Sequence, residues 1–489
     1  MVREEQNIKR LWFIWISLLY LSFAACDEEN LNITEPEKEG TRIVILYTND
    51  EHGWMETNEN SGGAAGLMGL WRQQEGYSEN GPYLILSGGD MWTGPAISTW
   101  FKGESMVDVM NGMQYDAAAI GNHEFDFKIE GLEDRIEESN FPLLSANIRE
   151  KATGIIPDFA IPYTLKEIDG VMIGLIGLTT TSTPLTTFPT HVADYDFISY
   201  NTALNEIVPQ AKEDGAELLI IIGHICGNEM QALIPTAVQL GISVIGGGHC
   251  NELIGGLEDG ITLIEGGSRM ESYAKVEIWF DDINNKVNAM IPSVHYNTGG
   301  DPDPQVESIV SFWKTQMNVS LSEVIGYANP EIGRRSDEMY NMITDSWLIT
   351  LQSADVSLTN TGGIRQSIPS GEITLATIVG LLPFENTIVQ LELTGQQLVD
   401  GIDNLVMGGM TTINGYRLSD GTPIQMDTTY SVLTTDYLYA RPDYSFQYND
   451  PDPYQTAIHY RQPVIDWIRS LDTSPGNPLN DYLDYNPRR

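Results

Sequence analysis

The segment DAAAIGNHEFDF, residues 116–127, joins a short apolar run to a dense group of polar residues. The group comprises Gly121, Asn122, His123, Glu124 and Asp126. A loop cap explains two of these residues and leaves the others without a structural role. In α/β folds, functional side chains gather at the C-terminal ends of strands. The segment therefore predicts an α/β fold with a functional site at this strand end.

The same pattern recurs along residues 41–297, where short β-branched runs alternate with helical stretches. Each run has the length of a strand, is apolar on both faces and stops at Gly, Asp, Asn, His or Thr, which is typical of central strands in a layered α/β domain. The runs are RIVILYTND, YLILSGGD, AAAIGNHE, VMIGLIGLT, ELLIIIGHI and ISVIGGGHC.

The chain of 489 residues is too long for one ordinary core, which predicts two domains. The turn-rich segment NTGGDPDPQ ends the first region, and residues 305–324 then read as a helix. Strand-like runs resume from about Ile325, at DVSLTNTGG, TIVQLELTG and YSVLTTDYL. We therefore expect a domain at 41–298, a linker with a hinge helix at 299–324, and a smaller α/β domain at 325–489.

The charge balance is strongly acidic, with 26 Lys and Arg against 68 Asp and Glu and a net charge of −42. Such a surface repels nucleic acid polymers, which require basic patches. A small anionic substrate would have to be held by local cations, either metal ions or arginines.

The N-terminus has the pattern of a processing segment. Arg3, Lys9 and Arg10 precede a largely apolar run at 11–25, which is shorter than the about 20 residues that span a bilayer. FAAC resembles a lipoprotein cleavage site, so we expect a signal peptide at 1–25, Cys26 as the acylated residue and a flexible tether at 26–40. An ordinary secretory signal or an uncleaved anchor are the alternatives. The expected location is the cell envelope, with the protein lipid-anchored to the outer membrane on its periplasmic or surface side.

Cys226 and Cys250 are the other cysteines, and each lies close to a histidine. Metal ligation, a single disulfide or simple packing would all fit this pattern. We expect packing, because small apolar thiols suit the ends of buried strands.

The strand ends together supply a set of metal-ligating side chains. They are Asp50, His52, Asp90, Asn122, His123, His224, His249 and Asn251. Residues two apart in a strand point the same way, so the D-x-H pair at Asp50 can act as one unit. Mixed carboxylate and imidazole ligands favour Zn, Mn or Fe over Ca or Mg. Each element alone is weak, but their combination predicts two divalent metals with a bridging carboxylate.

ILYTNDEHG, LSGGDMWTG, AIGNHEFD, LLSANI, IIIGHI and GGHCNE resemble the calcineurin-like metallophosphoesterases. Within that group they are similar to the bifunctional 5'-nucleotidase and UDP-sugar hydrolase family. The resemblance implies that residues 41–298 form a four-layer α/β/β/α catalytic domain. It also implies that Asp50, His52, Asp90 and Asn251 hold one metal.

By the same resemblance, Asp90 bridges to a second metal, which Asn122, His224 and His249 also hold. Many metallophosphoesterases have histidine where Asn251 stands, and an amide there is similar to the 5'-nucleotidase branch. A neutral amide oxygen should hold the first metal more loosely than an imidazole would.

His123 and Asp126 are not assigned as ligands of either metal. The resemblance implies that His123 stabilises the transferring phosphoryl group and the leaving oxygen, and that Asp126 orients it. Asp126 lies three residues on, so one turn can bring its carboxylate to the imidazole. A helix cap is the other interpretation of Asp126. Glu124 is expected to play a supporting role.

Residues 325–489 are similar to the C-terminal substrate domain of 5'-nucleotidases. Arg335, Asn360 and Arg365 would bind the phosphate or sugar, and Phe384 would stack on the base. The glycine pair of the family's second aromatic turn is replaced by Arg441 and Pro442 in ARPDYSF. There Asp443 matches the family pattern, and either Phe446 or Tyr444 is expected to supply the second ring.

These patterns together predict a 5'-nucleotidase, which releases nucleoside and phosphate from nucleoside 5'-monophosphates with a metal-activated water. A 2',3'-cyclic nucleotide phosphodiesterase or a UDP-sugar hydrolase on the same site is the alternative. A non-catalytic, nucleotide-binding surface lipoprotein represents a different class, but it predicts loss of metal ligands or of the His123–Asp126 pair, and the sequence shows neither.

Overall fold

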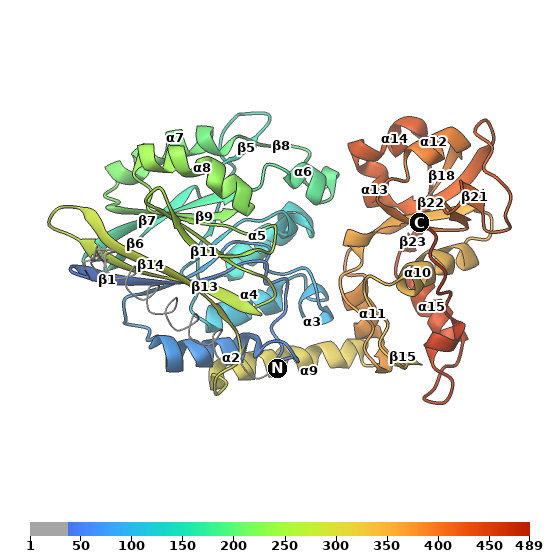
Figure 1. Ribbon diagram of the computed structural model, residues 1–489, viewed down its shortest axis with the longest axis horizontal. Helices are drawn as coiled ribbons and strands as arrows, with labels where there is room; N and C mark the ends of the chain where they lie inside the picture. The colour runs from blue at the N-terminus through green and yellow to red at the C-terminus, as the bar shows by residue number, and fades with distance from the viewer. Residues whose placement is uncertain (1–37) are drawn as a thin grey trace, which may run out of the picture. The chain divides into compact units, whose positions relative to one another are not determined.

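Two six-stranded sheets carry the N-terminal part of the chain in the computed structural model, which describes residues 38–489 (Figure 1). Cys26 and nearly all of the predicted tether lie outside the described residues. The first sheet has the order β14-β13-β1-β2-β3-β4. Its strands are β1 (Thr41–Thr48), β2 (Tyr83–Ser87), β3 (Ala117–Ala119), β4 (Leu143–Leu144), β13 (Ser272–Asp281) and β14 (Lys286–Tyr296).

The second sheet has the order β11-β12-β10-β9-β7-β6. Its strands are β6 (Tyr163–Ile168), β7 (Val171–Thr179), β9 (Leu218–His224), β10 (Val244–Gly246), β11 (Leu253–Glu258) and β12 (Ile261–Gly266). Strands β7, β9, β10 and β12 run parallel, and so do β1 to β4 in the first sheet. Parallel strands place their carboxyl ends at one edge, where the predicted metal ligands lie.

One apolar core fills the space between these sheets. Ile45 and Leu84 of the first sheet and Leu175 and Ile220 of the second all belong to it. Helices cover the outer faces, as the distinct core clusters on each side show. The first sheet packs against α2 (Gly63–Leu70), α4 (Glu104–Gly112), α5 (Lys128–Glu138) and α9 (Pro304–Leu321), and the second against α7 (Tyr200–Glu213) and α8 (Gly227–Leu240). This α/β/β/α arrangement confirms the predicted fold class.

Short elements connect these layers. They are the π-helix η1 (Trp71–Glu75), α3 (Ala96–Thr99), η2 (His123–Phe125), the paired strands β5 (Ile148–Glu150) and β8 (Tyr195–Phe197), α6 (Thr183–Thr186) and η3 (Pro189–Val192). The segments around η2 and from α6 to η3 contribute to the site described below.

The predicted linker helix is α9. Asp303 caps it by accepting hydrogen bonds from the backbone N–H groups of Gln305 and Val306, which satisfies two donors at the helix start. Trp313 and Met317 are buried in the same core as α2 and α4, so α9 packs on the N-terminal part of the chain. Its predicted role as a hinge stays a prediction.

A five-stranded sheet forms the C-terminal part, in the order β19-β16-β22-β18-β23. Its strands are β16 (Val356–Asn360), β18 (Thr387–Thr394), β19 (Leu405–Gly408), β22 (Thr429–Thr435) and β23 (Tyr454–His459). One face packs against α10 (Asp337–Thr350), α11 (Leu375–Leu381) and α15 (Gln462–Ser470), and the other against α12 (Gly395–Asp400), α13 (Asp436–Ala440) and α14 (Phe446–Asn449). The remaining elements are β15 (Val324–Ala328), β17 (Gly371–Thr374), η4 (Thr361–Gly363), β20 (Met410–Thr411), β21 (Arg417–Leu418), η5 (Pro442–Tyr444) and η6 (Leu479–Tyr482).

A disulfide joins Cys226 to Cys250, so the expectation of simple packing is wrong. Cys226 follows β9 and is the N-cap residue of α8, while Cys250 lies in the loop after β10. β9 and β10 are parallel neighbours, which brings the two loops that follow them together. Among residues 38–489, no helix combines the length and the apolar character needed to cross a bilayer.

Candidate metal centre and substrate pocket

Five of the seven predicted metal ligands have a left-handed backbone. The φ angles are 50° at Asp50, 46° at His52, 59° at Asp90, 73° at His249 and 57° at Asn251. Residues other than glycine rarely adopt φ > 0, and each instance costs about 1–3 kcal/mol. Such residues cluster at functional sites, where the surrounding structure fixes them. These turns let the chain reverse sharply after each strand while the side chains face one point.

Glu124 holds the turn that carries Asp90. Its Oε2 accepts hydrogen bonds from the backbone N–H groups of Gly121 and Asp90, at 2.6 and 2.8 Å, and its Oε1 accepts one from Met91 at 2.8 Å. A Cβ atom at Gly121 would lie 2.3 Å from Asp90 Oδ1, so only glycine fits this position. The predicted supporting role of Glu124 is therefore confirmed as a backbone clamp.

Asp90 lies at the centre of the predicted ligands. Its Oδ2 is 3.0 Å from His224 Nε2, and its Oδ1 accepts a hydrogen bond from the backbone N–H of His123 at 2.8 Å. His224 Nδ1 bonds to the carbonyl oxygen of Gly88 at 2.8 Å, which fixes the ring so that Nε2 faces the site. That Nε2 lies 3.2 Å from both Asn122 Oδ1 and His249 Nδ1.

The donor set fits divalent metal ions. One group of ligand atoms within 4.8 Å of each other comes from His52, Asp90 and His123, and another comes from Asp90, His224 and His249. Asp90 belongs to both groups, as a bridging carboxylate must. Asp50 Oδ1 lies 3.7 Å from His52 Nε2, and Asn251 lines the same pocket from an exposed position.

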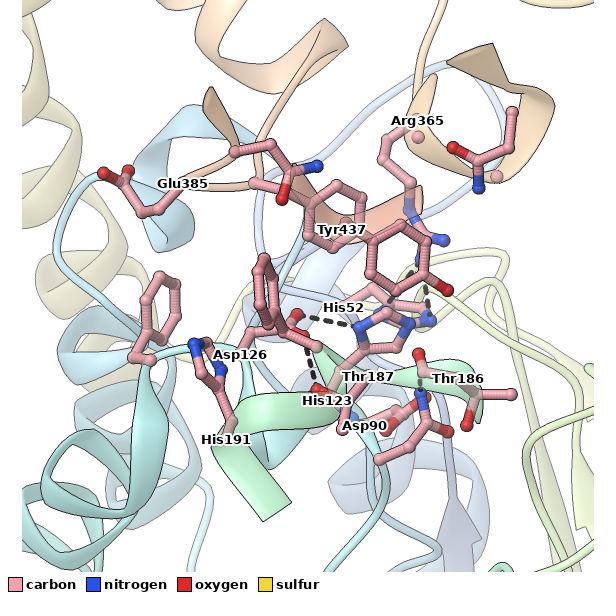
Figure 2. A pocket seen from close by; sticks show the side chains of 18 of the residues that line it. His52, Asp90, His123, Asp126, Thr186, Thr187, His191, Arg365, Glu385 and Tyr437 are labelled. Atoms are coloured by element: carbon pink, nitrogen blue, oxygen red, sulfur yellow. Dashed lines mark hydrogen bonds and ion pairs between the residues drawn. The ribbon is translucent and has the colours of Figure 1, made fainter. Parts of the chain in front are cut away.

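His123 and Asp126 form a direct pair, with 2.7 Å between Nδ1 and Oδ2 (Figure 2). Burial lowers the pKa of His123, but the charges of Asp126 and Asp90 outweigh it and leave this pKa above its ordinary value. Asp126 also accepts a hydrogen bond from Thr187 Oγ1 at 3.3 Å. Because Nδ1 is engaged, Nε2 is the ring atom left to act on a substrate.

A cavity of about 1240 Å³ joins the predicted ligands to the C-terminal residues. Arg335, Asn360, Arg365 and Phe384, which the sequence analysis assigns to substrate binding, line this cavity. Arg365 Nη2 lies 3.1 Å from His52 Nε2, and the Phe384 ring stacks at 5.8 Å on that of His123. Figure 2 shows Arg365 and Tyr437 above His52, His123 and Asp90.

The predicted second aromatic is wrong. Phe446 is completely buried in the core that α12 and α13 share, so neither face of its ring is open to a substrate. Tyr444 stacks on Phe446 at 5.7 Å. Tyr437, at the start of α13, lines the cavity instead.

Asp443 also differs from its predicted role. It pairs with Arg441, whose Nε and Nη2 lie 2.9 and 2.5 Å from the two carboxylate oxygens. Arg441 lines the cavity, whereas Asp443 does not belong to its wall. Arg441 also donates a hydrogen bond to Tyr437 Oη at 2.8 Å. Arg441, which stands where the family has a glycine, therefore holds the Asp443 carboxylate in an ion pair.

Several residues of the cavity wall were not predicted from the sequence. They are Thr186, Thr187, Phe188, His191, Arg269, Asp436 and Tyr437. Thr186 ends α6 and Thr187 follows it, outside any recognisable motif, and Asn122 Nδ2 donates to the Thr186 carbonyl at 3.2 Å. Asp436 and Tyr437 offered a signal, because they follow β22 and residues after a strand can reach a site at the sheet edge.

Residues 322–415 match the family described as 5'-nucleotidase, C-terminal domain. Human 5'-nucleotidase is 29% identical over 425 residues, which cover 74% of this chain and 72% of that protein. Residues 322–415 thus match the C-terminal domain of 5'-nucleotidases, and the chain over most of its length is similar to 5'-nucleotidases. The β16 end with Asn360 and Arg365 lies inside the matched segment, as does Phe384.

Other proteins to which this chain is similar are less identical or longer. Endonuclease YhcR of Bacillus subtilis (strain 168) is 25% identical over 462 residues, and the match covers 83% of this chain but 37% of that protein. The crystal structure of a 5'-nucleotidase precursor from Thermus thermophilus superposes with a TM-score of 0.76 at 20% identity. The superposition covers 92% of this chain and 99% of the Thermus thermophilus chain, which supports the two-part fold.

Proposed function

We propose that this protein hydrolyses nucleoside 5'-monophosphates to nucleoside and phosphate. The observation that carries the proposal is one cavity that joins three features. They are two overlapping groups of metal-ligating side chains, the His123–Asp126 pair, and a wall with arginines and an aromatic ring. A nucleoside 5'-monophosphate fits these features, because its phosphoryl group suits the metals and arginines, its leaving 5'-oxygen suits the His123–Asp126 pair and its base suits the aromatic ring.

The metals proposed here are two divalent ions, with Zn, Mn or Fe as the favoured identities. Asp50, His52, Asp90 and Asn251 would hold one, and Asp90, Asn122, His224 and His249 the other. Bound there, such ions supply Lewis-acid activation of a water molecule and neutralise charge on the phosphoryl oxygens.

The chain's own residues would then bind and orient the ester. Arg365 and Arg335 present planar guanidinium groups that match two phosphoryl oxygens, and Asn360 donates from the end of β16. Phe384 and Tyr437 offer ring faces to the base. His123 holds a proton at Nε2 for the leaving 5'-oxygen, because Asp126 stabilises the protonated ring through Nδ1.

Related phosphoesters are the second candidate, and one observation favours them. The Arg441–Asp443 ion pair and the burial of Phe446 change the side of the cavity that would meet the sugar and base. A 2',3'-cyclic nucleotide or a UDP-sugar would use the same metals and the same His123. Phosphate release from AMP, UMP, a 2',3'-cyclic nucleotide and UDP-glucose, each with Mn or Zn, separates these candidates. Absence of turnover with every nucleotide would contradict the proposal and favour a non-catalytic binding protein.

We further propose that the protein is exported and anchored in the cell envelope through lipid on Cys26. The apolar run before Cys26 supports export. The Cys226–Cys250 disulfide also supports it, since such bonds persist in oxidising compartments. Radiolabelled palmitate should enter the wild-type protein but not the Cys26→Ser variant, and equal labelling of both would contradict the anchor.

A further inference from the structure

Four arginines of the cavity wall have no carboxylate partner among residues 38–489. They are Arg269, Arg334, Arg335 and Arg365. In residues 38–489 most other arginines, such as Arg42, Arg149 and Arg488, pair with an acidic side chain. The protein has a large excess of acidic residues, so four guanidinium groups in one cavity that none of the described carboxylates neutralises indicate a site for a bound anion.

Arg269 is the member of this group that comes from the catalytic part and from no recognised motif. It follows β12 in the segment EGGSRMES and has a left-handed backbone with φ 57°. Its backbone N–H donates to the carbonyl oxygen of Asp50 at 2.8 Å, which ties its position to that of a predicted metal ligand.

The side chain of Arg269 is also fixed. Its guanidinium carbon lies 5.1 Å from the centre of the Trp54 ring, and Trp54 is two residues after His52. Stacking on an aromatic face holds a guanidinium in place while its N–H donors stay available. Arg269 is therefore ordered beside the metal-ligand groups without using its donors on an acidic side chain.

Arg269 and Arg365 face the same space. Both line the large cavity, and both line a small adjoining cavity with His52. Burial and the charges of Arg365 and Arg269 lower the pKa of Arg334 to about 10. Like charges held this close repel each other, and an anion bound between them would relieve the repulsion.

We propose that Arg269 is a further substrate-binding residue, which holds the phosphoryl group from the metal side while Arg365 holds it from the C-terminal part. The proposal rests on the proposed phosphoester hydrolysis and deepens it. The charge of Arg269 lies beside His52, with which it shares the small adjoining cavity, so it is placed to meet a phosphoryl oxygen near the predicted metal ligands.

The test compares Arg269→Gln with Arg269→Lys, and Arg417→Gln is the matched control. Arg417 is exposed in β21, outside the cavity, and its side chain donates a hydrogen bond to the backbone carbonyl of Gly421. A charge-assisted hydrogen bond lost from the bound anion should raise KM for a nucleoside monophosphate by about 10- to 100-fold in Arg269→Gln. Arg269→Lys should recover part of this loss, and Arg417→Gln should behave as the wild type.

Binding of inorganic phosphate to the metal-loaded proteins, measured by calorimetry, gives a readout apart from turnover. Arg269→Gln should weaken phosphate binding by about the same factor as KM, with both metals retained. Phosphate affinity within twofold of the wild type would overturn the proposal, even if KM rose. If the wild type binds phosphate but hydrolyses no nucleotide, the proposed function fails while this comparison still tests Arg269. Thermal unfolding of each variant excludes misfolding as the cause.

Discussion

The imidazole of His123 and the carboxylate of Asp126 meet at 2.7 Å across one short helical turn, η2. The turn begins directly after a predicted metal ligand, Asn122, so the pair has a fixed position beside the metal-ligand groups. Asp126 thereby selects the ring orientation of His123 that leaves Nε2 for the substrate.

Asp126→Asn should lower kcat by about 10- to 100-fold, less than the ~10²–10⁴ that a positioned acid–base group contributes. An amide cannot stabilise the protonated ring, although it keeps the shape of the side chain. Steady-state kinetics measure the effect, and Asp282→Asn, exposed in the turn between β13 and β14, is the control. An unchanged kcat would mean that Asp126 only caps the turn.

Removal of divalent metals with a chelator should abolish phosphate release, and Mn or Zn should restore it. Calorimetry should resolve two binding events of unequal affinity, because the neutral amide of Asn251 is a weaker donor to Zn than an imidazole is. Asn251→His should tighten the weaker event and leave the other unchanged. Equal affinity of both sites in the wild type would contradict this assignment of Asn251.

The Cys226–Cys250 disulfide joins the strand end that carries His224 to the loop that carries His249. It closes a loop with a sequence separation of 24 residues, for which chain entropy predicts about 3 kcal/mol of stabilisation. The Cys226→Ser, Cys250→Ser double variant should therefore unfold at lower denaturant concentration and bind the second metal more weakly. Treatment of the wild type with a reductant should produce the same change in both measurements. If the reduced protein kept the metal affinity of the oxidised protein, the disulfide would contribute to stability alone.

Variants of Tyr437 and Phe446 should have different effects, because Tyr437 lines the cavity whereas Phe446 is buried in the core. Tyr437→Ala should raise KM for a nucleotide by about tenfold, since stacking on a base contributes about 1–3 kcal/mol, and should destabilise the fold less than Phe446→Ala, because Tyr437 is only partly buried. Phe446→Ala should destabilise the fold by about 3–5 kcal/mol because it empties a buried site. Each variant serves as the control for the other in kinetics and in urea unfolding. If Phe446→Ala raised KM and Tyr437→Ala mainly destabilised the fold, Phe446 would be the stacking residue.

The pH dependence of stability should include a contribution from Glu75. Burial raises the pKa of this carboxyl, but hydrogen bonds from Lys275 and Tyr273 outweigh it and lower the pKa below its ordinary 4.5. A lowered pKa means that the stabilisation is complete above pH 4.5 and is lost as the pH falls through the folded-state pKa. Urea unfolding between pH 6 and pH 3 should show a shallower decline in Glu75→Gln. An equal decline in both proteins would contradict this assignment.

The catalytic half of the site could be predicted from the sequence because its residues follow buried strands. Asp50, Asp90 and His224 each end an apolar run, and parallel strands bring such ends to one edge. The supporting role of Glu124 could also be predicted, because the neighbouring residues already supplied enough metal ligands. The cysteines were less informative, because packing and a disulfide both suit two thiols at neighbouring strand ends.

The substrate half could be predicted only where a motif was local. Asn360, Arg365 and Phe384 lie in short blocks, and the structure brings them to the cavity. Phe446 and Tyr437 differ in burial, which depends on how α13 and α14 pack on the sheet and which no local pattern records. Arg269 reaches the cavity through a left-handed backbone after β12, which the sequence does not indicate.

Phosphate release from AMP and metal content, measured together in the wild type and in His123→Ala, give the sharpest test of the proposed function. We expect the wild type to turn over AMP, and His123→Ala to keep both metals while kcat falls by about 10²–10⁴. An inactive wild type with both metals bound would contradict the proposed function. Loss of a metal in His123→Ala would contradict the separation of His123 from the metal ligands.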